Sequence, residues 1–157
     1  MKKETLTPLL LVFFLVLAVS HAGAQSNQRI DELLGQSPAQ KGHAAYLVLT
    51  AAGIADESVT PQGAFQTAVD RGLLAAGSSP ADELTFGELS YLLMESFGIP
   101  GGVMYRIFPG PRYASREVIY RRWARLRRPP GQVISGDTAV RVVSVYLNSA
   151  AAQGGAR

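Results

Sequence analysis

The sequence predicts an all-α protein, a single domain of about six helices. Apolar residues recur at intervals of three and four through most of the chain, which is the spacing of helices with one buried face. Short motifs such as Thr-Pro and Gly-Ile-Pro lie between these stretches, where helices are expected to start or stop. No useful length alternates apolar and polar residues as a half-buried strand does. The run Val142–Tyr146 has strand propensity, but its place in a longer periodic stretch favours a helix.

The clearest helix covers Leu84–Ile99, and the domain is expected to be organised around it. Thr85 is placed to cap its first turn, and Glu88 three residues later completes a capping box. Gly98 supplies a left-handed stop, and Pro100 follows it. The buried face combines four large apolar residues at helical spacing: Leu89, Leu92, Leu93 and Phe97.

Three helices are expected before this one. Ser26–Gln36 is short and amphipathic, and should pack on the domain. Pro38–Gly53 is apolar nearly all round, which indicates a central position. Pro61–Leu74 begins with proline at its first position, directly after Thr60 as the N-cap.

The C-terminal part is expected to hold two further helices. The pattern leaves Gly101–Pro111 open, as a lid, a strut or a connection. Ser115 is expected to cap a helix over Arg116–Arg128, and Ser135-Gly136-Asp137 to start the last one. The tail at 153–157 is small and polar, and should be disordered.

The first 24 residues are expected to be a cleaved signal peptide. Lys2 and Lys3 precede the apolar run Leu9–Val19, and Ala22-Gly23-Ala24 ends the segment as a cleavage site. The run is shorter than the roughly 20 residues of a membrane span, which favours cleavage over an uncleaved anchor. The chain has no cysteine, which excludes a lipid anchor at this junction and disulfide bonds. The expected location is the periplasm or cell envelope, with secretion left open.

Three stretches align without gaps, which indicates an internal repeat. They are Lys41–Ile54, Phe86–Ile99 and Ser135–Asn148, and they place Gly42, Gly87 and Gly136 in register. The second and third copies are each preceded by another helix. One helix pair cannot bury its apolar face alone, whereas neighbouring pairs share a core. The prediction is two full units and a leading half-unit within 38–152, with 25–37 as a short helix and linker.

The second unit resembles an S-layer homology (SLH) module. The resemblance lies in the helix end at Ala68–Leu73, a loop with glycine and proline, and a helix start with Leu84, Thr85 and Glu88. It covers 60–99 well, 114–148 more weakly, and 38–54 as the second half of a unit. The resemblance implies a three-repeat helical module of the kind that holds cell-envelope polymers. The chain is divergent, because Phe86 stands where the family has its motif arginine.

A dense arginine cluster is the most distinctive local feature. On a continuous helix Arg121, Arg125 and Arg128 would share one face. Guanidinium groups bind phosphate and carboxylate through paired hydrogen bonds, so this face fits an anionic partner. The alternative is a solvated face stabilised by the helix dipole. The candidate binding residues are Arg116, Arg121, Arg122, Arg125, Arg128 and Trp123.

Catalytic and metal-binding patterns are absent from the sequence. His43 is the only histidine after the expected signal peptide, and no metal-ligand spacing surrounds it. Glu88 and Glu95 share a helical face, but a cap and a polar edge explain them better than acid–base catalysis. Met94 and Met104 are expected in the core. We therefore expect no catalytic residue, metal or cofactor.

The expected function is that of a non-enzymatic, exported cell-envelope protein. It would be a binding or structural module for an anionic envelope polymer or for lipid headgroups, peripheral to a membrane at most and without nucleic acid. The alternative is a periplasmic protein–protein adaptor that uses a groove around Trp123. Another envelope protein would then be the partner. The sequence leaves the oligomeric state open.

Overall fold

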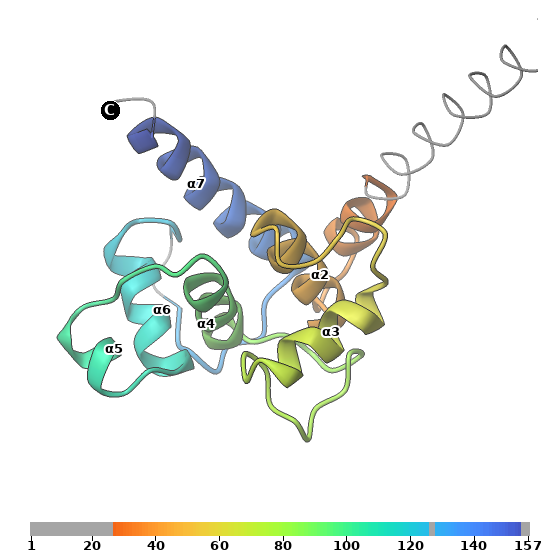
Figure 1. Cartoon of the computed structure of the whole chain (residues 1–157), viewed down its shortest axis with the longest axis horizontal. Coiled ribbons are helices and arrows are strands. Elements are labelled where there is room, and N and C mark those ends of the chain that lie inside the picture. Colours follow the sequence, from red (N-terminus) through yellow and green to blue (C-terminus); the bar gives the residue numbers. More distant parts are fainter. Residues whose placement is uncertain (1–26, 126–127, 155–157) are drawn as a thin grey trace, which may run out of the picture.

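The structure, a computed structural model, describes residues 27–125 and 128–154, and every regular element in these ranges is helical. The prediction of an all-α fold is confirmed. A helical segment at 27–34 comes first. Six helices follow (Figure 1): α2 (Lys41–Ala51), α3 (Pro61–Asp70), α4 (Phe86–Ser96), α5 (Val103–Ile107), α6 (Pro111–Tyr120) and α7 (Gly136–Gly154).

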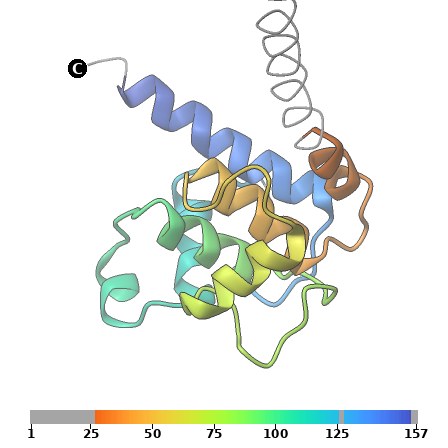
Figure 2. The same cartoon turned by 45° about the vertical axis from the view of Figure 1, so that its right-hand side comes forward.

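The helices pack in pairs of a repeating kind. α2 lies against α3, and α4 lies against α6. The third pair joins the two ends of the domain, because segment 27–34 lies beside the first turn of α7 (Figure 2). There the Gly136 amide donates a hydrogen bond of 2.9 Å to the Gln36 carbonyl, and Leu33 is buried. Within the segment expected as a helix and linker outside the repeats, residues 27–37 therefore contribute to the core through Leu33.

A ring of three backbone hydrogen bonds joins the units at their centre. The Ala39 amide donates to the Ile134 carbonyl at 2.8 Å, and Leu84 donates to Ala39 at 2.8 Å. Ile134 closes the ring by donating to Leu84 at 3.1 Å. All three residues are buried, so these bonds are shielded from water. The ring thus connects the segments that lead into α2, α4 and α7.

The aligned glycines occupy equivalent places at the first turns of α2, α4 and α7. Gly42 donates to the Pro80 carbonyl at 2.8 Å, and Gly87 donates to Pro130 at 2.7 Å. Gly136 makes the corresponding bond to Gln36, as described above. Each glycine lets another backbone segment approach where a side chain would stand, which is the physical reason for glycine at this position.

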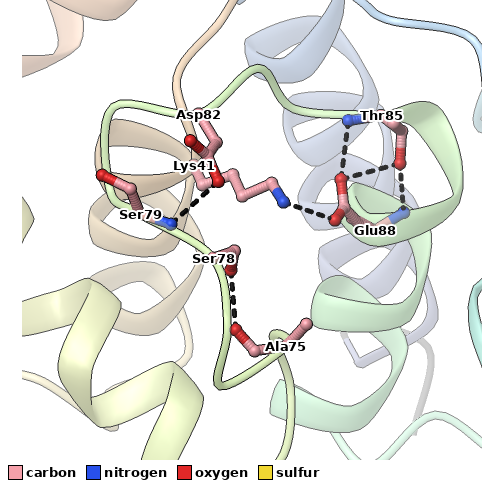
Figure 3. Close-up of polar contacts among 7 residues, drawn as sticks. All are labelled: Lys41, Ala75, Ser78, Ser79, Asp82, Thr85 and Glu88. Carbon is pink, nitrogen blue, oxygen red and sulfur yellow. Dashed lines mark hydrogen bonds and ion pairs between the residues drawn. The ribbon is translucent and has the colours of Figure 1, made fainter.

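A buried ion pair connects the first two units (Figure 3). The Lys41 ammonium group lies 2.8 Å from a Glu88 carboxylate oxygen, and the two side chains are only 10% and 20% exposed. The other Glu88 oxygen accepts hydrogen bonds from the Thr85 amide and hydroxyl. The loop beside Lys41 is held by its own bonds, including one from the Ser79 amide to Asp82 at 2.8 Å. Glu88 thus caps α4 and neutralises Lys41 at the same time.

The helix-end signals in the sequence function as predicted. The capping box of Thr85 and Glu88 is fully formed, and Thr60 caps α3 ahead of Pro61. Gly98 follows α4 in the left-handed region, with φ of 58°. These local preferences agree with the packing at the starts of α3 and α4. α3 ends at Asp70, before the expected Leu74, and α4 covers Phe86–Ser96 within the expected Leu84–Ile99.

α6 does not cover the range expected for the arginine helix. It runs from Pro111 to Tyr120, whereas the sequence predicted a helix over Arg116–Arg128 with Ser115 as its cap. Ser115 is instead buried inside the helix and donates to the Arg112 carbonyl. The helix stops early because Arg122 adopts a left-handed conformation, with φ of 61°. Gly72 does the same after α3, with φ of 71°.

Most large apolar side chains gather in one core that spans all three units. A smaller cluster of Met94, Tyr105 and Ala114 holds α5 against α4 and α6. The prediction that Met94 is a core residue is therefore confirmed. The same prediction for Met104 is wrong, because its side chain is 58% exposed on α5.

Tyr105 attaches α5 to α4. Its hydroxyl donates to Glu95 at 2.5 Å, and its ring lies 6.5 Å from that of Tyr91. Burial, and next the hydrogen bond to Glu95, hold the pKa of Tyr105 well above its ordinary value. The neutral hydroxyl therefore stabilises the folded state below the unfolded pKa of about 10, and this contribution falls as pH rises further.

Replacing Tyr105 with phenylalanine tests this attachment. We expect Tyr105→Phe to lower the free energy of unfolding at pH 7 by about 1 kcal/mol, because Glu95 loses its donor. The difference from wild type should shrink as pH rises above about 10. Urea unfolding at several pH values measures both effects. A difference that stays constant up to pH 11 would contradict the assignment.

Other sequence-based boundaries differ slightly. α7 extends through Gly154, so the helix includes Gln153 and Gly154 from the tail expected to be disordered. Residues 155–157 and the expected signal peptide at 1–24 lie outside the described residues. Within the described ranges, no helix combines the length and apolar character that crossing a bilayer requires.

Candidate anion-binding site

α6 and the turn at 129–131 line an open hollow of about 670 Å³, which we call the arginine pocket. Three arginines reach it, together with the buried hydroxyl-bearing Ser115 and a wall of apolar and proline residues. Its lining consists of Arg112, Ser115, Arg116, Ile119, Arg128, Pro129, Pro130 and Gly131. The pocket therefore combines cationic groups with an apolar floor.

Local structure brings the three arginines together. Arg112 and Arg116 are four residues apart on α6, so they share one face of the helix. Arg128 lines the same hollow and lies directly before a turn in which the Gln132 amide donates to the Pro129 carbonyl at 3.1 Å. The bond from the Gly87 amide to Pro130 fixes that turn to the start of α4. This contact positions the turn that directly follows Arg128.

The electrostatics of the arginine pocket are one-sided. None of its lining residues is acidic. Within the ranges that the structure covers, none of the ion pairs involves Arg112, Arg116 or Arg128. The Arg116 guanidinium lies 5.8 Å from the centre of the Tyr113 ring, an arrangement that favours the cation. Three uncompensated guanidinium groups on one hollow attract a phosphate or carboxylate.

Arg121 does not belong to this site. Its Nε lies 3.9 Å from Glu117, and its Nη2 donates to the Pro100 carbonyl. The guanidinium also lies 5.3 Å from the centre of the Trp123 ring. The expected shared face of Arg121, Arg125 and Arg128 does not exist, because all three follow the end of α6. Arg121 instead fastens the end of α6 to the segment after α4.

Arg125 and Trp123 line a second hollow, whereas Arg122 does not. Arg122 is exposed in the left-handed turn, and it lines neither pocket described here. Trp123 is only 8% exposed, and its ring meets Tyr146 edge-on at 4.9 Å. The hollow beside it measures about 390 Å³ and is lined by Trp123, Ala124, Arg125, Arg128, Asp137, Thr138, Arg141 and Val142. The predicted groove around Trp123 is thus present, although its indole belongs mainly to the core.

The second hollow contains an acidic residue that offsets part of its positive charge. Asp137 lies 3.1 Å from Arg141, so one of its cations is already paired. Arg128 lines both hollows and separates them. The lining of the arginine pocket is therefore the more cationic of the two.

The residues considered for catalysis have structural partners. His43 contacts Gln36 at 3.0 Å through Nδ1 and lies 3.5 Å from Glu32 through Nε2. Glu88 is occupied by its cap and Lys41, and Glu95 accepts from Tyr105. Among residues 27–125 and 128–154, no group of three or more potential ligands is placed to hold a metal ion.

Two arginines that line the hollows, Arg112 and Arg141, were not among the predicted binding residues. Arg112 precedes the start of the helix expected at Arg116, so it was not assigned to the same face. A signal for the correct helix start was present in the sequence, because Pro111 stands at the same place before its helix as Pro61 does, and both prolines begin helices. Starting the helix at Pro111 puts Arg112 and Arg116 one turn apart.

Comparisons with known proteins leave the site to be interpreted from its own geometry. No protein-family model, no curated protein and no solved structure matches this chain.

Proposed function

We propose that this chain is a non-enzymatic module of the cell envelope that binds an anionic polymer through the arginine pocket. The observation that carries the proposal is the convergence of Arg112, Arg116 and Arg128 on one cavity with no acidic lining residue. A phosphate or carboxylate group would accept hydrogen bonds from two or three guanidinium groups there. Localisation to the envelope rests on the leader-like sequence at 1–24.

The shape of the site supports a polymer segment as the ligand. The cavity has room for more than one small anion, and prolines and Ile119 provide apolar contact area for the carbon skeleton of a sugar or polyol chain. The turn at 129–131 is fixed to α4 through Gly87, so the backbone next to Arg128 is already held in place. A site of this kind binds without needing a rearrangement of the fold.

Sedimentation with isolated cell envelopes tests the proposal. We expect the wild-type chain to sediment at low salt and to be released as salt increases, because screening weakens exposed charge pairs. The variant Arg112→Ala/Arg116→Ala/Arg128→Ala should bind roughly 10- to 100-fold more weakly, from three contacts worth up to about 1 kcal/mol each. The measurement is the bound fraction across a salt series.

A charge-matched control separates the pocket from net charge. Arg71→Ala/Arg125→Ala/Arg141→Ala removes an equal number of positive charges, one from the end of α3 and two from the second hollow. The proposal expects this control to keep most of the binding. Equal loss in both variants, or binding that is insensitive to salt, would contradict it.

The second candidate function is a protein–protein adaptor, supported by the hollow beside Trp123. Such binding would be largely apolar and tolerant of salt. Substituting Val142 or Thr138 at that hollow would weaken adaptor binding and leave the arginine pocket intact.

A further inference from the structure

α5 carries an exposed apolar tip, formed by Val103, Met104, Ile107 and Phe108. Their side chains are 58–63% exposed. Four large apolar residues in six positions are unusual on a protein surface and mark an interaction site. Figure 1 and Figure 2 both place α5 at the outer edge of the domain, and among the helices it packs mainly on α6.

The orientation of α5 places the tip on the outside of the domain. Tyr105 is the one residue of α5 that is buried, and its hydroxyl is bonded to Glu95. With Tyr105 fixed inward, the four apolar side chains of the tip project away from the core. Gly101-Gly102 before the helix and Pro109-Gly110 after it allow the chain to turn sharply at both ends. The apolar exposure is therefore built into the fold.

Cationic residues lie on α5 itself and on α6, the helix that α5 packs against. Arg106, Arg112 and Arg116 are exposed, and no acidic residue occurs between Glu95 and Glu117. Those two carboxylates are already engaged, Glu95 by Tyr105 and Glu117 by Arg121 at 3.9 Å.

Aromatic contacts link the tip to its cationic rim. Phe108 stacks on Tyr113 at 6.4 Å, and Tyr113 lies beneath Arg116. An apolar tip with a basic rim matches the layered chemistry of an anionic lipid surface, whose acyl region lies just beneath its phosphates.

We propose that the α5 tip inserts into the interfacial region of an anionic lipid bilayer. A protein partner would need a preformed cavity to bury a projecting apolar tip. A fluid lipid surface needs none, because its molecules can rearrange around the tip. The long arginine side chains would reach the phosphates while the four apolar side chains enter the acyl boundary. The tip shares Arg112 and Arg116 with the arginine pocket, but none of its four apolar side chains lines that pocket, so the inference holds even if the pocket binds no polymer.

Site-specific fluorescence tests the insertion. The chain has no cysteine, so Met104→Cys introduces a single site for an environment-sensitive nitrobenzoxadiazole label. The full chain is mixed with vesicles of phosphatidylcholine alone or with phosphatidylglycerol. We expect a blue shift and stronger emission with the anionic vesicles, and quenching by acyl-chain quenchers. A label at the exposed position Gln66→Cys on α3 should stay in water, and it reports on binding elsewhere in the chain.

Matched variants make the test decisive. Ile107→Ser/Phe108→Ser should lower vesicle insertion at position 104 by about 100-fold, since each inserted side chain contributes roughly tenfold. Leu34→Ser/Leu147→Ser removes two exposed apolar residues from other surfaces and should leave insertion unchanged. An aqueous signal at 104 with anionic vesicles would overturn the proposal. So would an equal response to neutral vesicles, or a lipid-independent shift that rises with protein concentration, as a second copy of the chain would give.

The pocket variant distinguishes this proposal from the proposed function. Arg128→Ala alters the arginine pocket but lies outside the rim of the tip. It should weaken polymer binding and keep the fluorescence response at position 104. Loss of the response in Arg128→Ala alone, with the serine variant unaffected, would overturn insertion by the tip.

Discussion

Replacing Glu88 with alanine is expected to lower the free energy of unfolding by about 3 kcal/mol. The substitution leaves Lys41 as an uncompensated charge in a site where its side chain is 10% exposed. It also removes half of the capping box at the start of α4, which contributes about 1 kcal/mol. Urea denaturation followed by circular dichroism measures the loss.

Two further variants separate the ion pair from the cap. Glu88→Gln keeps an acceptor for the Thr85 amide but loses the charge, so it should be destabilised mainly through Lys41. Lys41→Met in the Glu88→Gln background should recover most of that loss, because no buried charge remains. If Lys41→Met instead lowers the free energy of unfolding further, the ion pair with Lys41 does not explain the contribution of Glu88 to stability.

Replacing Gly136 with alanine is expected to cost at least about 3 kcal/mol, or to detach segment 27–34 from α7. The Leu33 carbonyl already fills the space that a Cβ atom on Gly136 would need. The Leu33 carbonyl belongs to the backbone and cannot move aside as a flexible side chain can. The contact between segment 27–34 and the start of α7 would therefore have to open. Hydrogen exchange at Ala39 and Ile134 measures whether the central ring opens with it.

The other two aligned glycines make this a graded prediction. A Cβ on Gly87 would stand 2.9 Å from the Pro130 carbonyl, and one on Gly42 would stand 3.0 Å from Pro80. Their alanine variants should therefore be destabilised less than Gly136→Ala, by roughly 1–2 kcal/mol. Gly77→Ala is the control, because nothing lies within 4 Å of its Cβ position. Equal effects at Gly136 and Gly77 would contradict the close approach.

Local chemistry made much of the fold predictable from the sequence. The capping box at Thr85, the Thr60-Pro61 start and the Gly98 stop are short-range signals, and the structure confirms all three. The aligned glycines correctly marked equivalent helix starts because their role depends on close backbone contact. What the sequence did not reveal is the closure through Leu33, which joins segments about one hundred residues apart.

The arginine site was only partly predictable, because its helix ends differently from the pattern. Gly72 ends the preceding unit's first helix, and Arg122 occupies the same left-handed position after α6. Arginine gives no stop signal, so periodicity extended the helix through Arg128. Trp123 takes the place of Leu73, and both side chains are buried after the turn. The arginines were correctly identified as a cluster, but their grouping depended on a turn that only tertiary contacts fix.

The fold and the candidate site are connected through the units' shared contacts. Gly87 holds the turn at Pro130, and that turn places Arg128 opposite Arg112 and Arg116. A change that loosens Gly87 should therefore weaken anion binding as well as stability. Thermal unfolding and envelope sedimentation of Gly87→Ala would be expected to change together.

The most direct measurement is nuclear magnetic resonance of the arginine side chains during titration with inorganic polyphosphate. If the arginine pocket binds anions, the Nε–Hε signals of Arg112, Arg116 and Arg128 should shift together along one saturating curve. Signals from Arg71 and Arg141 should change little over the same range. Shifts spread evenly over all arginines, without saturation, would show only general charge attraction and would contradict the account.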